Sequence, residues 1–198
     1  RKRVIQFKHI GLLTFFMLIG EFVFSQDEDM KNNVVQQRIE FISEQLESES
    51  IDVCEIVRDR AQEWQYLADE RDVEIIVQAP DNLMVDANQL AVREIIDNYM
   101  DNALEVAPPK SQITLTVLAL VDVVEIVVSD SGRGMSPLQR ERAFDRFWRA
   151  DIDSNRRTGS GLGLAIVAQL AQASGLRVEL RESPNRGVDA VVGIPNSL

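Results

Sequence analysis

The chain of 198 residues is poor in the side chains that build cross-links and metal clusters. It has one cysteine, Cys54, and one histidine, His9, so neither a disulfide framework nor a cysteine–histidine zinc site can form within it. Cys54 stands in the apolar run 51–57 (IDVCEIV), which predicts a buried, inert thiol. The chain also lacks an excess of positive charge, because it has 21 lysines and arginines and 32 acidic residues, for a formal net charge of −11. That balance argues against a partner nucleic acid.

The composition is otherwise that of a globular protein. A hydrophobic fraction of 45% with a charged fraction of 27% excludes disorder throughout the chain. The length leaves room for one ordinary domain and an appendage.

The first 25 residues differ from the rest. A basic start (RKR) precedes the apolar run 10–20, which Glu21 interrupts, and the β-branched Val23 and the small Ser25 follow. This pattern indicates a secretory signal cleaved before Gln26, or a membrane anchor at 10–24, although the run is short for a full span. A buried helix of a larger domain is the alternative.

Residues 26–50 are polar and mostly acidic, and they predict an amphipathic helix. Its apolar stripe consists of Val34, Val35, Ile39, Ile42 and Leu46.

The body of the protein is expected over 51–196. The hydrophobic periodicity and the Gly and Pro positions predict helices and strands in the order α-β-α-β-β-α-loop-α-β-β. The predicted helices begin near 52 and then cover about 87–106, 137–147 and 162–173, and the strands cover 73–77, 113–120, 123–129, 177–181 and 189–194. This order predicts an α/β fold, a two-layer sandwich with helices on one face of a mixed, mostly antiparallel sheet.

Two asparagines stand one helical turn apart in the segment 93–104 (REIIDNYMDNAL). Asn98 and Asn102 therefore share a helix face and can point at a hydrated magnesium ion or at phosphates. Two exposed asparagines without a ligand are the alternative.

An acid beside a tight glycine turn follows in 130–135 (DSGRGM). Asp130 ends an apolar strand, and Gly132 and Gly134 let the backbone turn sharply. A carboxylate held there can accept a hydrogen bond from the exocyclic amine of a base. A plain strand-to-helix turn is the alternative.

A second glycine-rich segment, 158–166 (TGSGLGLAI), opens an apolar helix. The backbone amides at such a helix start suit phosphate oxygens. The segment is neither a Walker loop nor a dinucleotide fingerprint, because no Gly-Lys-Ser/Thr follows and no strand feeds it. A flexible loop with a helix cap is the alternative, but the three segments in this order predict a nucleotide site.

Together these segments resemble the catalytic ATP-binding domain of sensor histidine kinases, in the superfamily shared with gyrase, Hsp90 and MutL. The resemblance covers about 51–196. It rests on an N box at 97–103 (DNYMDNA), a first glycine box at 130–134, an F box at 142–149 (RAFDRFWR), a second glycine box at 159–163 and a closing segment around 185–187 and 194–195.

The resemblance implies a Bergerat-type ATP-binding fold and a set of roles. Asp130 would bind the adenine amine, Asn102 would ligate Mg²⁺, and Asn98 would support the metal and the phosphates. A lid over about 149–161 would close over the triphosphate. The further ATP-binding residues implied are Gly132, Gly134, Phe147, Arg149, Gly159, Ser160, Gly161, Leu162 and Gly163.

By the same resemblance the protein would be a histidine protein kinase of a two-component system. It would transfer the γ-phosphoryl group of Mg-ATP to a histidine on a separate dimerisation domain and serve a response regulator. The accepting histidine is not recognisable here, because His9 lacks the surroundings of a phosphoacceptor. Glu105 and Val106 also depart from the basic and aromatic residues that often follow the N box.

These departures leave two alternatives: a nucleotide-binding regulatory or degenerate module without kinase activity, and a secreted interaction protein supported by the head alone. The head also conflicts with the body. A signal-like start would export the chain, whereas an ATP-dependent kinase needs its ATP-binding domain in the cytoplasm beside the membrane. We therefore expect residues 1 to about 50 to come from a different context than the body, and the body alone to be monomeric.

Overall fold

The computed structural model describes residues 47–145, 148, 162–184 and 186–196. The elements follow one another along the chain as β1 (Glu49–Asp52), α3 (Val53–Glu70), β2 (Val73–Gln78), β3 (Met84–Ala87), α4 (Gln89–Val106), β4 (Ser111–Ala119), β5 (Val123–Ser129), α5 (Pro137–Arg142), α6 (Gly163–Ala173), β6 (Arg177–Glu182) and β7 (Val188–Pro195).

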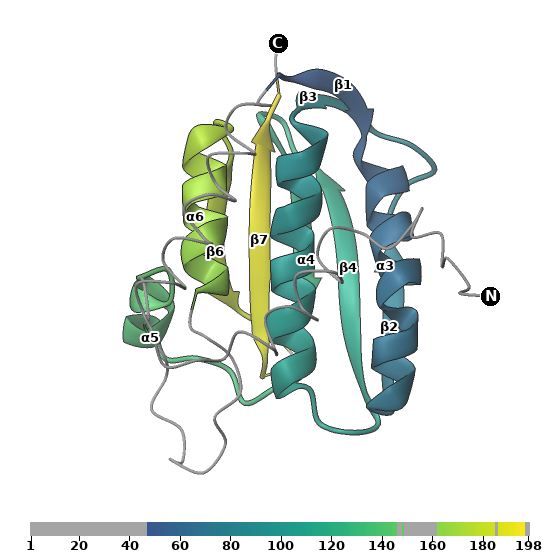
Figure 1. Ribbon diagram of the computed structural model, residues 1–198, viewed down its shortest axis with the longest axis vertical. Coiled ribbons are helices and arrows are strands. Elements are labelled where there is room, and N and C mark those ends of the chain that lie inside the picture. The colour runs from purple at the N-terminus through teal and green to yellow at the C-terminus, as the bar shows by residue number, and fades with distance from the viewer. Residues whose placement is uncertain (1–46, 146–147, 149–161, 185, 197–198) are drawn as a thin grey trace, which may run out of the picture. The chain divides into compact units, whose positions relative to one another are not determined.

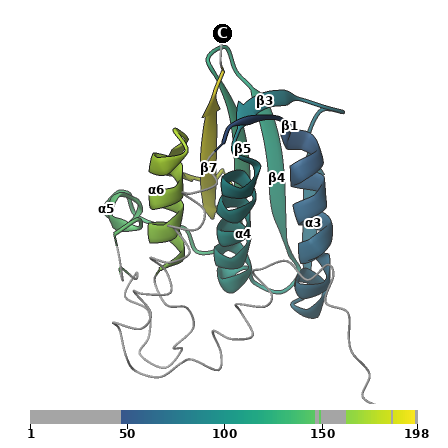
Figure 2. The same cartoon turned by 45° about the horizontal axis from the view of Figure 1, so that its top comes forward.

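The main sheet has the strand order β2-β4-β5-β7-β6. β2 and β4 are parallel, and the other neighbours are antiparallel. The parallel pair needs a crossover, and α4 lies within it. Figures 1 and 2 show α3, α4 and α6 side by side against one face of the sheet. The predicted two-layer α/β sandwich with a mostly antiparallel sheet is confirmed.

The core lies between this helical layer and the sheet. Alternate residues of β4 face it, so Ile113 and Leu115 are fully buried while their neighbours are partly exposed. α4 contributes the largest buried side chains from the helices, including Ile95 and Tyr99. The Tyr99 hydroxyl donates to the Val191 carbonyl at 3.1 Å, which fixes α4 over β7.

The ends of α4 follow from its sequence. The Asn88 side chain accepts a hydrogen bond from the Ala91 amide at 2.8 Å and caps the helix. Pro108 stands two residues after the last helical residue, where it cannot continue the helix. α4 therefore holds Asn98 and Asn102 in its second half.

The short strands β1 and β3 were not predicted. They pair antiparallel, with Ile51 opposite Val85. Glu49 and Ser50 thus belong to a strand, and assigning them to the acidic helical segment was wrong. Each strand has four residues, and neither ESID nor MVDA alternates polar with apolar side chains, so no period-two pattern marks them in the sequence.

The helix predicted over 137–147 is shorter in the structure, where α5 ends at Arg142. A capping box between Ser136 and Gln139 starts it, but none of its residues is buried, so no packing extends it. Cys54 is a free, buried thiol as predicted, and burial raises its pKa.

Within the described residues no helix is long and apolar enough to cross a membrane. The apolar run at 10–24, His9 and the amphipathic stripe at 34–46 lie outside those residues.

Candidate functional site

The two asparagines of α4 face the start of α6. A Cβ atom built on Gly163 would lie 3.1 Å from Oδ1 of Asn98 and about 4 Å from the amide atoms of Asn102, at 3.9 Å from Nδ2 and 4.0 Å from Oδ1. The amide Nδ2 of Asn98 donates to the Glu94 carbonyl at 2.7 Å, which fixes the side chain and leaves Oδ1 towards Gly163. The absence of a side chain at Gly163 therefore keeps the space above the asparagine pair open.

Asn102 has a buried donor without a partner. In the described part of the chain its Nδ2 atom makes no hydrogen bond. An unpaired buried donor costs free energy, and an acceptor supplied by a ligand would remove that cost. Phosphate oxygens are acceptors, and the Oδ1 atom of the same amide is the type of ligand that Mg²⁺ takes.

The start of α6 adds a positive end to this space. Leu162 precedes the helix and gives no side-chain cap, and the first N–H groups of any α-helix have no partner within it. These groups and the helix dipole favour an anion at Gly163. Because α6 packs against α4, this end lies beside the asparagine pair.

Asp130 lies directly after β5 and is buried, with 7% of its surface exposed. Its Oδ1 accepts from the Gly132 amide at 2.7 Å, and its Oδ2 accepts from the Val188 amide at 3.2 Å. Desolvation raises the pKa of Asp130, and the charge of Asp189 adds to this, while the two amide hydrogen bonds act in the opposite direction. The carboxylate is thus fixed in a largely dry place, where an amine hydrogen bond counts for more than in water.

The glycine turn after Asp130 is closely packed on both sides. A Cβ atom on Gly132 would lie 2.8 Å from Cγ2 of Val106, so the end of α4 lies against the turn. Gly134 has a φ of +73°, and a Cβ atom there would lie 2.5 Å from the Arg186 carbonyl oxygen. Both predicted glycines are therefore required by the local packing.

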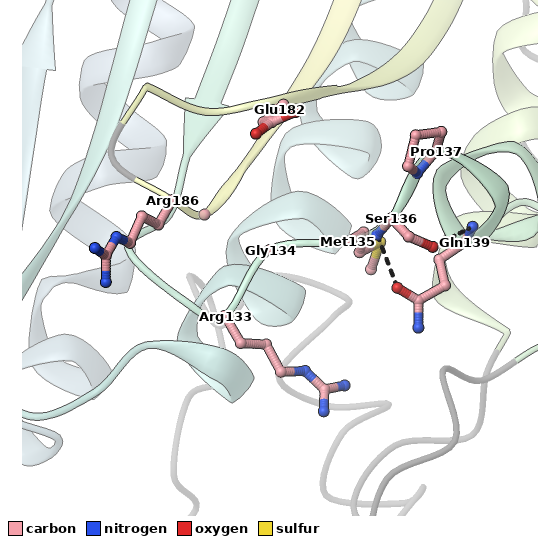
Figure 3. A pocket seen from close by; sticks show the side chains of 9 residues that line it. Arg133, Gly134, Met135, Ser136, Pro137, Gln139, Glu182 and Arg186 are labelled. Atoms are coloured by element: carbon pink, nitrogen blue, oxygen red, sulfur yellow. Dashed lines mark hydrogen bonds between the residues drawn. The ribbon is translucent and has the colours of Figure 1, made fainter.

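A pocket of about 460 Å³ lies on the flank of this turn. Figure 3 shows the segment from Arg133 to Gln139 on one side of it and Glu182 and Arg186 on the other. The lining is mostly polar, and it contains no residue of the asparagine pair.

Several predicted site residues lie outside the described residues. These are Phe147, Arg149, Gly159, Ser160 and Gly161. The roles of the lid and of most of the second glycine box therefore stay predictions. Conversely, the prediction missed Gly187 and Val188, which contact Asp130 from a distant part of the chain. The only sequence signal for them was Gly187, at the end of the segment 185–187 ahead of a predicted strand.

The described residues contain no group of three or more His, Cys, Asp or Glu side chains placed to hold a metal ion. A magnesium ion at this site would have few protein ligands, with Asn102 as the candidate.

An α/β sandwich that gathers an asparagine pair, a helix N-terminus and a buried acid at one end of the sheet has the layout of a nucleotide-binding ATPase domain. Residues 87–198 match the family of histidine kinase-, DNA gyrase B- and HSP90-like ATPases. The chain belongs to this family, and within it the chain is an ATP-binding catalytic domain of the sensor histidine kinase type.

The similar proteins agree with this assignment. The chain is 36% identical over 155 residues to the swarming motility regulation sensor protein RssA of Serratia marcescens, covering 77% of this chain and 32% of RssA. It is 33% identical over 146 residues to the sensor-like histidine kinase SenX3 of Mycobacterium bovis, covering 73% and 36%. The chain thus spans about a third of the length of the curated relatives it matches.

Solved structures give the same family. The mycobacterial sensor histidine kinase MprB superposes with a TM-score of 0.63 at 27% identity, over 75% of this chain and 97% of that one. Full-length ShkA in complex with AMPPNP gives a TM-score of 0.65 at 27% identity, over 76% and 31%. These matches favour neither a module without kinase activity nor a secreted interaction protein.

Proposed function

We propose that this chain binds Mg-ATP and transfers its γ-phosphoryl group to a histidine on a dimerisation domain that the sequence does not recognisably contain. The observation that carries the proposal is the space between Asn98, Asn102 and Gly163, which holds an unpaired buried donor beside a helix N-terminus. Asp130, a buried carboxylate directly after β5 of the main sheet, is assigned to the adenine end of the site.

Each residue has a definite task in this proposal. Asp130 accepts a hydrogen bond from the 6-amino group of adenine, because its two oxygens each keep a lone pair beyond the amide that holds them. Asn102 offers Oδ1 to the metal and Nδ2 to a phosphate oxygen. Asn98, fixed by Glu94, supports the same oxygens, and the amides around Leu162 and Gly163 hold the phosphate chain.

These residues fit a magnesium nucleotide. The unpaired Asn102 donor gains an acceptor, and the open face of Gly163 admits groups that a side chain would exclude. When bound, magnesium supplies charge neutralisation and orientation of the phosphate oxygens. The chain itself contributes positioning and fixed donors, which is the main protein contribution in phosphoryl transfer.

The remaining residues of the second glycine box and the F box, including Gly159, Ser160, Gly161, Phe147 and Arg149, complete the site as a lid. The accepting imidazole comes from a partner domain, and the phosphoryl group passes on to a response regulator. We further propose that, where this body is part of a native kinase, the protein is membrane-associated with the ATP-binding domain in the cytoplasm. The apolar segment 10–24 can serve as the anchor only if it does not carry the body across the membrane.

The first test is calorimetric titration of Mg-ATP into the full chain, into Asp130→Ala and into Asn102→Ala. We expect both substitutions to abolish measurable binding. Asn82→Ala is the matched control, because Asn82 is exposed in the turn before β3 and remote in sequence from every site segment. Binding that survives in Asp130→Ala and Asn102→Ala would rule out this site.

Kinase activity needs a second test. The chain is incubated with γ-labelled ATP and a purified histidine-bearing dimerisation domain, such as that of a related sensor kinase. Label on the added domain, absent with Asn102→Ala, supports histidine kinase activity. A parent that binds ATP but labels no dimerisation domain offered would favour the nucleotide-binding module without kinase activity.

A further inference from the structure

The turn between β6 and β7 lies against the acid that the proposed function assigns to adenine. Asp130 comes directly after β5 and Val188 begins β7, so the two segments are far apart in sequence but adjacent in the sheet. The Asp130 amide donates to the Val188 carbonyl at 3.0 Å, and the Val188 amide donates back to Oδ2 of Asp130 at 3.2 Å. The second bond joins the backbone of the turn to the functional carboxylate itself.

Gly187 allows this approach. A Cβ atom built there would overlap the carbonyl oxygen of Asp130 and would lie 2.5 Å from its Oδ1 atom. Gly187 is not among the glycines with a positive φ, which in the described residues are Gly134 and Gly175. Its need for glycine is therefore one of contact with Asp130, not of backbone conformation.

Two backbone hydrogen bonds connect the described residues of the turn independently of Asp130. The Ser183 amide donates to the Gly187 carbonyl at 3.1 Å, and the Arg186 amide donates to the Ser183 carbonyl at 3.1 Å. On its other side the Arg186 carbonyl lies against Gly134, and Figure 3 shows Arg186 opposite the Arg133–Gly134 segment. The turn after β5 thus has Gly134 where Arg186 approaches it, and the β6–β7 turn has Gly187 where Asp130 approaches it.

The two hydrogen bonds to the Asp130 carboxylate do different work. The bond from Gly132 is local, and it moves with the loop that carries both residues. The bond from Val188 comes from the sheet and orients the carboxylate relative to the rest of the domain. Without it the carboxylate is held only by the local bond from Gly132, that is, relative to its own loop.

We propose that Gly187 is a positioning residue for adenine recognition: it acts through the Val188 amide to fix the direction of the Asp130 carboxylate, and so determines the preference for a base with a 6-amino group. The inference rests on the proposed function of Asp130. It adds the β6–β7 turn, which contacts neither asparagine nor the start of α6 in the contacts given above, to the determinants of specificity.

The test uses the full chain and compares Mg-ATP with the magnesium complex of purine riboside triphosphate, which lacks the 6-amino group. One hydrogen bond between the amine and a buried carboxylate predicts that the parent binds ATP roughly tenfold or more tightly than the analogue. In Gly187→Ala this preference should fall to within about threefold, while affinity for the analogue changes little. If Gly187 had a merely structural role, Gly187→Ala would weaken the binding of both nucleotides alike.

Gly193→Ala is the matched control. Gly193 also lies in β7, and a Cβ atom there would lie 3.2 Å from Cγ2 of Val123, 3.7 Å from Cβ of Arg177 and 3.9 Å from the Arg177 carbonyl oxygen, with no contact to Asp130 among these nearest atoms. It should keep the parent preference. A parent that binds neither nucleotide would overturn the proposed function. A parent that prefers ATP, with a Gly187→Ala variant that prefers it equally, would instead overturn the positioning role of Gly187 and leave the proposed function standing.

A second variant covers poor folding of Gly187→Ala. Val188→Pro removes the N–H that holds Oδ2, at the first residue of a strand, where proline is tolerated. Loss of the preference in a cooperatively unfolding Val188→Pro supports the proposal. If neither variant folds, the contact is a requirement of the fold and the positioning role is overturned.

Discussion

At the scale of single residues, the burial of Asp130 makes its charge sensitive to pH. Desolvation raises its pKa above the ordinary value of 3.8, so it takes up a proton at a higher pH than an exposed aspartate. The folded state then binds this proton more tightly than the unfolded state does. Between the folded pKa and 3.8, acidification therefore adds to the stability contributed by this group, while the carboxylate loses the charge that we propose accepts the adenine amine.

The first prediction follows from this opposition. As the pH falls through the pKa of Asp130, we expect the preference for ATP over purine riboside triphosphate to fall from about tenfold towards unity. Calorimetry with both nucleotides measures the ratio, and because both carry the same triphosphate, titration of the phosphates cancels. Asp130→Asn should have a low ratio at every pH. A parent ratio that stays constant from pH 7.5 down to the ordinary aspartate pKa of 3.8, while the protein remains folded, would contradict the prediction.

Glu105 brings a negative charge near the proposed phosphate site. It is exposed, stands three residues after Asn102 on α4, and lies in the last turn, where the helix dipole also disfavours an anion. Glu105→Lys reverses the charge. We expect a gain of about fivefold in ATP affinity, corresponding to about 1 kcal/mol of electrostatic interaction near the surface.

The control for Glu105→Lys is Glu70→Lys, which makes the same change at the exposed end of α3. Both variants should raise the melting temperature slightly, because each places a cation at a helix C-terminus. Only Glu105→Lys should tighten ATP binding, as measured by calorimetry at low salt. Equal affinities in the two variants would show that Glu105 does not face the phosphates.

At the scale of elements, α3 and α4 are joined by a buried polar cluster. Arg60 and Asp97 are 7% and 4% exposed, and Nη1 of Arg60 lies 3.2 Å from Oδ2 of Asp97. The indole Nε1 of Trp64 donates to Oδ1 of Asp97 at 2.7 Å. Desolvation raises the pKa of Asp97, while these two partners lower it. The cluster fixes the rotation of α4, since Asp97 directly precedes Asn98.

Removing one partner should be costly. Arg60→Met leaves Asp97 buried with Trp64 as its remaining donor, and we expect a loss of about 3–5 kcal/mol in the free energy of unfolding from urea denaturation at pH 7. The double variant Arg60→Met/Asp97→Asn should recover most of it, because it removes the uncompensated charge. Part of the loss in Arg60→Met should also disappear at low pH, where Asp97 is protonated.

The matched control is Arg93→Met. Arg93 lies 3.1 Å from Asp59 and also connects α4 with α3, but both side chains are partly exposed. Such a pair contributes about 1 kcal/mol or less. Similar losses for Arg60→Met and Arg93→Met would mean that the Arg60 cluster has no special energetic role.

The elements differ in how well the sequence predicted them. α4 and α6 have long apolar periodicities and clear ends, so both were placed within about two residues. β1 and β3 depend on each other across the intervening helix α3, and their four-residue patterns contain no local signal of that pairing. The predicted end of α5 was wrong because Ala143 and Phe144 form a turn, and α5 itself has no buried residue whose packing would extend it.

At the scale of the whole molecule, the proposed site draws on three segments that were predicted from the sequence pattern. Asn98, Asn102, Asp130 and Gly163 were selected from spacing and glycine content, and the fold brings the asparagines to Gly163. The role of Gly187 could not be selected in this way. Its importance arises from a contact with the Asp130 backbone across two strands, and a lone glycine before a strand does not show what it will approach.

The folded body also begins earlier than its sequence pattern indicated. The Asn88 side chain donates to the Glu47 carbonyl at 3.1 Å, and Ile51 is buried in β1. Oδ1 of Asp52 accepts from the amides of Cys54 and Leu83 at 2.9 and 3.0 Å, which caps α3 and holds the approach to β3. Residues 47–52 therefore belong to the ATP-binding body.

This boundary predicts the behaviour of two truncations. Residues 47–198 should unfold cooperatively and bind Mg-ATP as the full chain does. Residues 53–198 lose the cap, at about 1 kcal/mol, and the burial of Ile51, at about 1.5–3 kcal/mol, so they should be about 2.5–4 kcal/mol less stable. Asp52→Ala should reproduce the part of the loss that comes from the cap, whereas Asp86→Ala, at an exposed position of β3, should not.

The hydrogen bond from Leu83 lowers the pKa of Asp52. The stability that Asp52 contributes is therefore present above pH 3.8 and is lost as the pH falls through the lower folded pKa. Equal stability of the two truncations in urea at pH 7 would place the start of the domain at α3, and the β1–β3 pair would then contribute nothing to the fold.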